Sequence, residues 1–172
     1  MATTTILNKL AQVRRRERLL RFVWGGARVV AVALVLLALC CLADWLIDRG
    51  HTVTDAGSHD PEEVVDYPPL CAAVSRMVAS RAADLAIVIG GSGQGEVIAC
   101  NKVRGVRAGL AYSRFAVQIS RGNNDANVMV IGTKVVSDEE AVELVALWLA
   151  TSFNGGRHQD RVDQITALEA SP

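Results

Sequence analysis

From Thr52 to the C-terminus, short apolar and β-branched runs alternate with stretches whose apolar positions recur at helical spacing. This alternation is typical of a parallel sheet covered by helices on both faces. We therefore expect a three-layer α/β/α domain with a sheet of about five strands. The pattern places four of them, at Thr52–Ala56, Leu85–Ile89, Arg107–Ala111 and Val128–Ile131.

Helix start signals lie between these strands. Ser113 can cap one helix, and Ser137 with Glu140 forms a capping box for another. Ser58–Pro69, rich in charged residues and proline, is expected to be a loop. The expected helices are Leu70–Ser80, Val97–Lys102, Arg114–Ser120, Asp138–Thr151 and Gly156–Glu169.

The N-terminal segment, residues 1–43, differs from the domain expected over residues 44–172. Basic residues precede an uncharged run of 15 residues, Val29–Ala43. Extended back to Phe22 it reaches 22 residues, enough to span a bilayer. The segment is therefore either a membrane anchor or signal peptide over Phe22–Ala43, or a strand (Val29–Leu34) and helix (Val35–Asp48) of the domain.

Composition narrows the kind of partner. The formal net charge is zero, and no basic face is predicted beyond the N-terminus, so a nucleic-acid-binding protein is not indicated. The four cysteines form no CxxC pair, and the three histidines are scattered, so no metal site is expected. The expected partner is a small molecule or another protein chain.

A glycine-rich turn follows the expected strand Leu85–Ile89. Its sequence, GGSGQGE from Gly90 to Glu96, matches neither the dinucleotide nor the P-loop spacing, so a nucleotide site is not indicated. Consecutive backbone N–H groups before a helix favour an anion. The alternative is a tight strand-to-helix turn that only needs the backbone freedom of glycine.

Four blocks carry a resemblance to a known family: GGSGQGEVIACNK from Gly90, GVRA from Gly105, NDANV from Asn124 and GRH from Gly156. In this order and spacing they resemble the ribose-5-phosphate isomerase B family, which includes the galactose-6-phosphate isomerase subunits. The resemblance covers about residues 44–170. It implies a Rossmann-like fold and a cytoplasmic enzyme of the pentose phosphate pathway, with a single-pass membrane-anchored form as the alternative.

The resemblance implies an aldose–ketose isomerase, with the conversion of ribose 5-phosphate to ribulose 5-phosphate as its reaction. The proton moves between C1 and C2 through an enediolate, without a cofactor or metal. One branch of the family uses a cysteine base at the position of Gly90, and the other a glutamate at that of Glu96. Glu96 is therefore the expected base. Its alternative role is that of an acid at a helix N-terminus.

Other site residues follow from the same resemblance. The amides of Gly91, Gly93 and Gly95 would stabilise the enediolate oxygen, and the Ser92 hydroxyl would bind the sugar. Arg157 and Arg161, at i and i+4 of the last helix, would bind the phosphate, unless they only form a solvated face. Lys134 stands where the family has a third phosphate-binding arginine. The residues concerned are Gly91, Ser92, Gly93, Gly95, Lys134, Arg157 and Arg161.

The chain departs from the family at two places. Asn123 replaces the histidine credited with ring opening, whereas Asn124 matches the family asparagine that holds the substrate. The Asp-His pair of the family's first strand would fall at Val32 and Ala33, which cannot titrate. These losses favour, as the alternative function, a non-catalytic or weakly active sugar-phosphate-binding module that Phe22–Ala43 tethers to a membrane.

The resemblance also implies an assembly. Family members form dimers with shared active sites, so a homodimer or tetramer is expected, with Asn123, Asn124 and Lys134 facing the Glu96 loop of the neighbour. Pairing with a related subunit, as in galactose-6-phosphate isomerase, is the alternative.

Overall fold

The computed structural model describes residues 42–58 and 65–170. The chain divides into two compact units, residues 1–54 and 55–172. The described part of the first unit is a helix over residues 42–47, closed by a turn at Gly50 (φ +83°), and an extended segment. The candidate strand Val29–Leu34, Val32 and Ala33, and all but the end of Phe22–Ala43 lie outside the described residues. Within the described ranges, no helix is long and apolar enough to cross a membrane.

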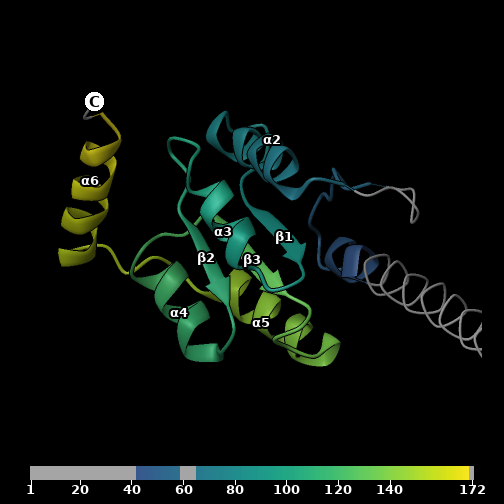
Figure 1. Cartoon of the computed structure of the whole chain (residues 1–172). Helices are drawn as coiled ribbons and strands as arrows, with labels where there is room; N and C mark the ends of the chain where they lie inside the picture. The colour runs from purple at the N-terminus through teal and green to yellow at the C-terminus, as the bar shows by residue number, and fades with distance from the viewer. Residues whose placement is uncertain (1–41, 59–64, 171–172) are drawn as a thin grey trace, which may run out of the picture. The chain divides into compact units, whose positions relative to one another are not determined.

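The second unit alternates strands and helices, as Figure 1 shows. The strands are β1 (Ala86–Gly90), β2 (Ala108–Ala111) and β3 (Val128–Gly132). The helices are α2 (Tyr67–Ala79), α3 (Gln94–Cys100), α4 (Arg114–Gly122), α5 (Asp138–Ala150) and α6 (Arg157–Ala170).

The strands form a parallel sheet in the order β1-β3-β2. β3 lies in the middle, with Gly90 paired to Gly132 on one side and Ala111 to Ile131 on the other. Every residue of β3 is buried, so both faces of the sheet are covered. The predicted α/β class and parallel sheet are thus confirmed, with three strands in the described part of the chain rather than about five.

The expected strand Thr52–Ala56 is not one. Its residues form neither helix nor strand and join no sheet within the described part of the chain. The threonine and valine residues suit a strand, but a strand forms only where a neighbour satisfies its backbone hydrogen bonds. The candidate strand Val29–Leu34 lies outside the described residues.

The core follows the alternation of β3. Val128 and Val130 point to one face, where they cluster with Cys71 and Val78 of α2 and Cys100 of α3. Met129 and Ile131, equally buried, point to the other face. The parallel strands thus carry near-continuous apolar runs, as strands buried on both faces do.

The helix boundaries depend on the capping residues. Ser113 and Ser137 cap α4 and α5 as predicted, each accepting a hydrogen bond from the backbone N–H three residues on, at 3.2 Å. α2 begins at Tyr67, earlier than expected, because Pro68 and Pro69 occupy its first turn. Proline fits there, since the first N–H groups of a helix have no partner within it.

Candidate active site

The glycine-rich loop leaves the carboxyl end of β1. The chain after β3 holds it, because the N–H groups of Thr133 and Lys134 donate to the carbonyls of Gly90 and Gly91, both at 2.9 Å. Gly93, the residue before α3, has a φ of +77°, and an added Cβ would overlap the side chain of Leu110. Glycine is therefore required here for both conformation and space.

Glu96 lies in the first turn of α3 and is 8% exposed. Its side chain folds back over Gly90: a Cβ built on Gly90 would lie 2.8 Å from the Glu96 Cγ and would overlap its carboxyl group. The carboxyl of Glu96 thus fills the space that a side chain at position 90 would occupy. The expected role of Glu96, a glutamate base in place of a cysteine at Gly90, stays a prediction.

Tyr67, at the start of α2, is a site residue that the sequence did not indicate. Its ring packs on Gly95, where an added Cβ would lie 2.7 Å from the Tyr67 Cζ and even closer to the hydroxyl. The ring is 46% exposed, so it forms an open aromatic wall beside the loop. The contact joins two segments far apart in the chain, and no local pattern signals it.

Ser92 and Lys134 lie at the same edge of the sheet, both exposed. The Ser92 Oγ accepts a hydrogen bond from the Gln94 N–H at 3.3 Å. The Lys134 side chain lies beside Gly91 of its own chain, with its Nζ 3.9 Å from the position of an added Gly91 Cβ. The resemblance groups Lys134 with Asn123 and Asn124, facing the loop of the neighbouring subunit. The structure instead places Lys134 beside the loop of its own chain, because it follows β3 whereas the asparagines precede β3.

The asparagine pair occupies the opposite edge, in the turn between α4 and β3. The Asn123 Oδ1 accepts a hydrogen bond from Asn154 Nδ2 at 3.0 Å. Asn124 is exposed, and its backbone carbonyl accepts from Arg107 Nε at 3.0 Å. Asn123 is thus held inside the turn, and the Asn124 side chain faces outward.

An ion-pair network fixes this turn. Asp125 pairs with Arg107 at 2.8 Å and, at shorter range, with Arg121. The backbone of Asp125 is in the left-handed region, with a φ of +47°. Aspartate tolerates that conformation better than most residues. The network therefore stabilises a strained turn.

Arg157 and Arg161 lie at the start of α6, both exposed and four residues apart on one face. The other end of α6 is tied to the domain by Glu169, whose carboxylate accepts from the Gly105 N–H at 2.9 Å. Between α6 and the start of β2 is a groove of about 490 Å³, lined by Ile165, Leu168 and Asn124 among others. In Figure 1, α6 stands away from the arrowheads of the strands.

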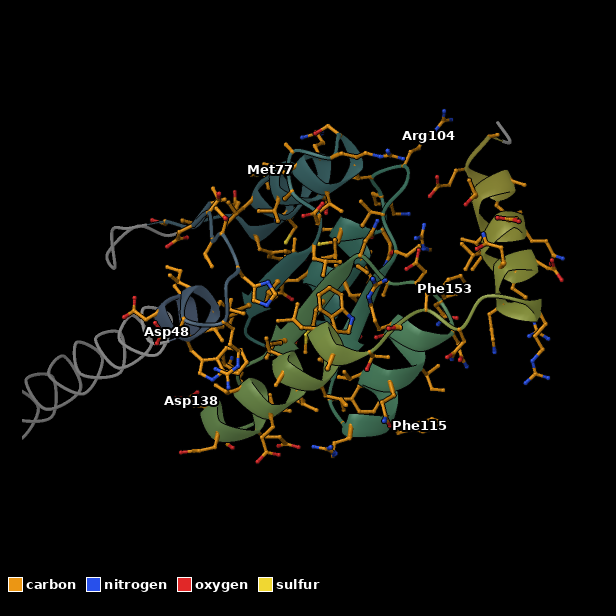
Figure 2. All side chains as sticks on the ribbon, turned by 180° about the vertical axis from the view of Figure 1, so that it is seen from behind. Asp48, Met77, Arg104, Phe115, Asp138 and Phe153 are labelled. Carbon is orange, nitrogen blue, oxygen red and sulfur yellow. The ribbon has the colours of Figure 1, made fainter. Side chains whose placement is uncertain are left out.

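The expected site residues therefore fall into two groups. The carboxyl edge of the sheet carries the loop from Gly91 to Glu96, and Lys134. The amino edge carries Asn123 and Asn124, with Arg157 and Arg161 on the helix beyond it. In Figure 2, Phe115 and Asp138 mark the carboxyl edge, and Met77 and Arg104 the opposite side. The strands keep the edges roughly 13 Å apart.

One thiol near the carboxyl edge has a perturbed pKa. Cys71 lies one helical turn after Tyr67 on α2 and is 2% exposed. Burial, and then the neighbouring Cys100 thiol and Glu96 carboxylate, raise the pKa of Cys71 to about 12. Cys71 is therefore a neutral thiol at physiological pH.

The carboxyl edge of the sheet has the features of a small-molecule binding site. In a parallel α/β domain, ligands bind outside the carboxyl ends of the strands. Here that edge offers a nearly buried carboxylate, backbone N–H groups and an aromatic ring to a small molecule. Within the described residues, no three His, Cys, Asp or Glu side chains are grouped to hold a metal ion.

The comparison with known proteins assigns the family. A family model described as Ribose/Galactose Isomerase matches residues 40–165, and the chain belongs to this family. Ribose-5-phosphate isomerase B of Escherichia coli is 42% identical over 124 residues, which are 72% of this chain and 83% of that protein. The chain is therefore an aldose–ketose isomerase.

Two solved structures agree in fold. Ribose-5-phosphate isomerase B of Clostridium thermocellum aligns with a TM-score of 0.74 and 40% identity, covering 78% of this chain and 90% of that one. The enzyme from Mycoplasma genitalium, with bound ribulose 5-phosphate, aligns with a TM-score of 0.75 and 32% identity, covering 80% and 91%.

Proposed function

We propose that this chain interconverts ribose 5-phosphate and ribulose 5-phosphate, with Glu96 as the general base. The names of the relatives support the substrate. The role of Glu96 as base is supported by the position of its carboxyl group. This group occupies the space over Gly90, where the other branch of the family has its cysteine base.

The proposed chemistry is one proton transfer in two halves. The Glu96 carboxylate removes the proton from C2 of the open-chain aldose, and the electron pair of that bond forms the enediolate. The N–H groups of Gly91, Gly93 and Gly95 stabilise the charge on the enediolate oxygen. The hydroxyl proton of O2 passes to O1, so that C2 becomes the carbonyl carbon as Glu96 returns the abstracted proton to C1. Ser92 binds a hydroxyl of the sugar.

Three cations would bind the phosphate. Lys134 reaches the site from the carboxyl edge of the same chain, whereas Arg157 and Arg161 lie on α6 beyond the other edge. Within one chain, the buried strands of the sheet lie between Lys134 and the two arginines. We infer a homodimer in which α6 and the Asn124 turn of one subunit complete the glycine loop of the other. Two chains in an isologous arrangement would then form two equivalent sites.

Asn123 limits what this site does with a ring-closed sugar. An asparagine cannot shuttle a proton near neutral pH, and the Asn123 side chain is already held by Asn154. The enzyme would therefore act on the open-chain form of the substrate.

The test is the conversion of ribose 5-phosphate by the full-length chain and its Glu96→Gln variant. General base catalysis contributes roughly 10²–10⁴-fold, so the variant should lose about that factor in kcat. Glu139→Gln is the matched control, because Glu139 is an exposed acid in the first turn of α5 and its loss changes the charge equally.

Three results would count against this function. Equal activity of Glu96→Gln and the parent chain would remove Glu96 as the base. Loss of activity in Glu139→Gln as well would point to charge or folding. No conversion by any form, with ribose 5-phosphate still bound in calorimetry, would favour a sugar-phosphate-binding module.

A further inference from the structure

Two buried thiols that the proposed reaction does not use lie close together in the core. Cys71 on α2 is 2% exposed, and Cys100, the last residue of α3, is fully buried. The Cys100 Sγ donates to the carbonyl oxygen of Cys71 at 4.0 Å. They belong to one buried apolar cluster.

The two cysteines flank the proposed base in sequence and lie near it in space. Cys100 lies one helical turn after Glu96 on α3, and Cys71 lies one turn after Tyr67 on α2. The segment from Cys71 to Cys100 contains β1 and the whole glycine-rich loop. A covalent bond between the sulfurs would therefore close a ring around the catalytic loop.

We propose that Cys71 and Cys100 form a redox switch, in which a reversible disulfide displaces Glu96 from its place over Gly90 and lowers the isomerase activity. The effect on activity rests on the proposed role of Glu96. The disulfide itself does not depend on that role.

The displacement follows from packing. A disulfide brings the sulfurs from the non-bonded separation of two free thiols to about 2.05 Å, so the Cys71 and Cys100 side chains must rotate or α2 and α3 must shift toward each other. One turn along, Tyr67 already contacts Gly95, so the helices have no room to close there. The movement then falls on the first turn of α3, which carries Glu96. Misplacing a catalytic group by about 1 Å can cost on the order of 10²-fold in rate.

The redox step is balanced by a named oxidant. Each thiol gives up one proton and one electron, and the sulfurs form one S–S bond. A diazene such as diamide takes up both protons and both electrons at its N=N bond and becomes a hydrazine. In a cell, a low-molecular-weight disulfide would act by exchange and leave as two thiols.

The reaction should be slow in the folded protein. The raised pKa keeps Cys71 protonated, and the thiolate is the attacking form. The titratable groups that face Cys71 are Cys100 and Glu96. Long exposure to the oxidant at mildly alkaline pH is therefore the suitable condition.

The experiment treats the full-length chain with diamide at pH 8.5 and maps disulfides by mass after trypsin cleavage without reductant. Cleavage at Arg49, Arg76, Arg81 and Lys102 places Cys71 in residues 50–76 and Cys100 in residues 82–102, each as the sole cysteine. Cys40 and Cys41 fall in a separate peptide, residues 29–49. We expect a 50–76/82–102 cross-link, a loss of ribose 5-phosphate isomerisation on the order of 10²-fold, and recovery of both with dithiothreitol.

Cys100→Ser, which keeps the volume of the side chain, should retain its activity in diamide. If that variant does not fold, the mapping on the parent chain still decides. No 50–76/82–102 cross-link after prolonged oxidation overturns the pair, and a cross-link with unchanged activity overturns the switch. If the chain forms the cross-link in diamide but does not isomerise the sugar in its reduced state, the proposed function is overturned and the disulfide is not.

Discussion

The two edges of the sheet differ in how their polar side chains are satisfied. At the amino edge, Asp125 pairs with Arg107 and Arg121, and Asn123 is bonded to Asn154. At the carboxyl edge, Glu96, Ser92 and Lys134 have no side-chain partner among the described residues. Polar groups that satisfy each other stabilise a fold, whereas side chains without such a partner around the glycine loop are available to a ligand.

The difference shows what each edge does within one chain. The carboxyl edge holds Glu96, Ser92 and Lys134, and no other side chain of the described residues binds them. At the amino edge, Asp125, Arg107, Arg121 and Asn123 are bonded to other side chains, whereas Asn124, Arg157 and Arg161 are exposed. Variants of the glycine loop and Glu96 should therefore affect activity, and variants of the paired groups at the amino edge should affect stability.

Among the variants that leave the Glu96 carboxyl in the chain, the largest effect is expected for Gly90→Ala. The added methyl group would overlap the Glu96 carboxyl, a flexible side chain that can rotate away, so the domain should fold and the base should be displaced. We expect kcat to fall on the order of 10²-fold, with little change in the urea midpoint.

The neighbouring glycine provides the comparison. In Gly91→Ala the new methyl group would meet only the Lys134 side chain, at 3.8 Å, and the amide is kept. This variant should retain most of the activity. A greater loss for Gly91→Ala than for Gly90→Ala would contradict the importance of the space over Gly90.

A smaller effect is expected at the amino edge, for Asp125→Asn. Asparagine tolerates the left-handed backbone as aspartate does, so the change removes mainly the charge that pairs with Arg107 and Arg121. The groups are a fifth to a third exposed, so solvent screens the pairs, and we expect the free energy of unfolding to fall by about 1–2 kcal/mol. Urea unfolding measures the loss; a fall in kcat with unchanged stability would mean that the turn acts in chemistry.

The smallest effect concerns Cys71 and alkaline pH. The folded-state pKa, about 12, lies above the ordinary value of 9.0, so the neutral thiol favours the folded chain. This stability is fully present below pH 9 and is lost as the pH rises toward 12. At pH 10 the loss should be about 1 kcal/mol. Unfolding from pH 8 to 10 should show a steeper decline for the parent chain than for Cys71→Ala, and parallel curves would rule out the shift.

Features encoded by neighbouring residues were predictable from the sequence. The strands at Ala86, Ala108 and Val128 follow from apolar runs, and the caps at Ser113 and Ser137 from their position before a helix. Thr52–Ala56 shows the limit of such patterns, because its residues suit a strand but only a neighbouring strand can make it one.

The site was harder to predict, because contacts between distant segments decide it. The resemblance named Glu96, but its position over Gly90 depends on how α3 leaves the loop. The packing of Tyr67 on Gly95 has no local signal. The family resemblance groups Lys134 with the asparagines. The parallel register of β1 and β3 instead places the residues after β3 beside the loop after β1.

The most direct test of the account mixes two defective chains, because its central claim is that the edges meet only between subunits. Glu96→Gln removes the base, and Arg157→Ala with Arg161→Ala removes the exposed cations of α6. After unfolding and refolding together in equal amounts, half of the dimers would be mixed, each with one intact site of two. We predict a return of about a quarter of the parent activity. A mixture no more active than the sum of the two variants would contradict a site shared between chains.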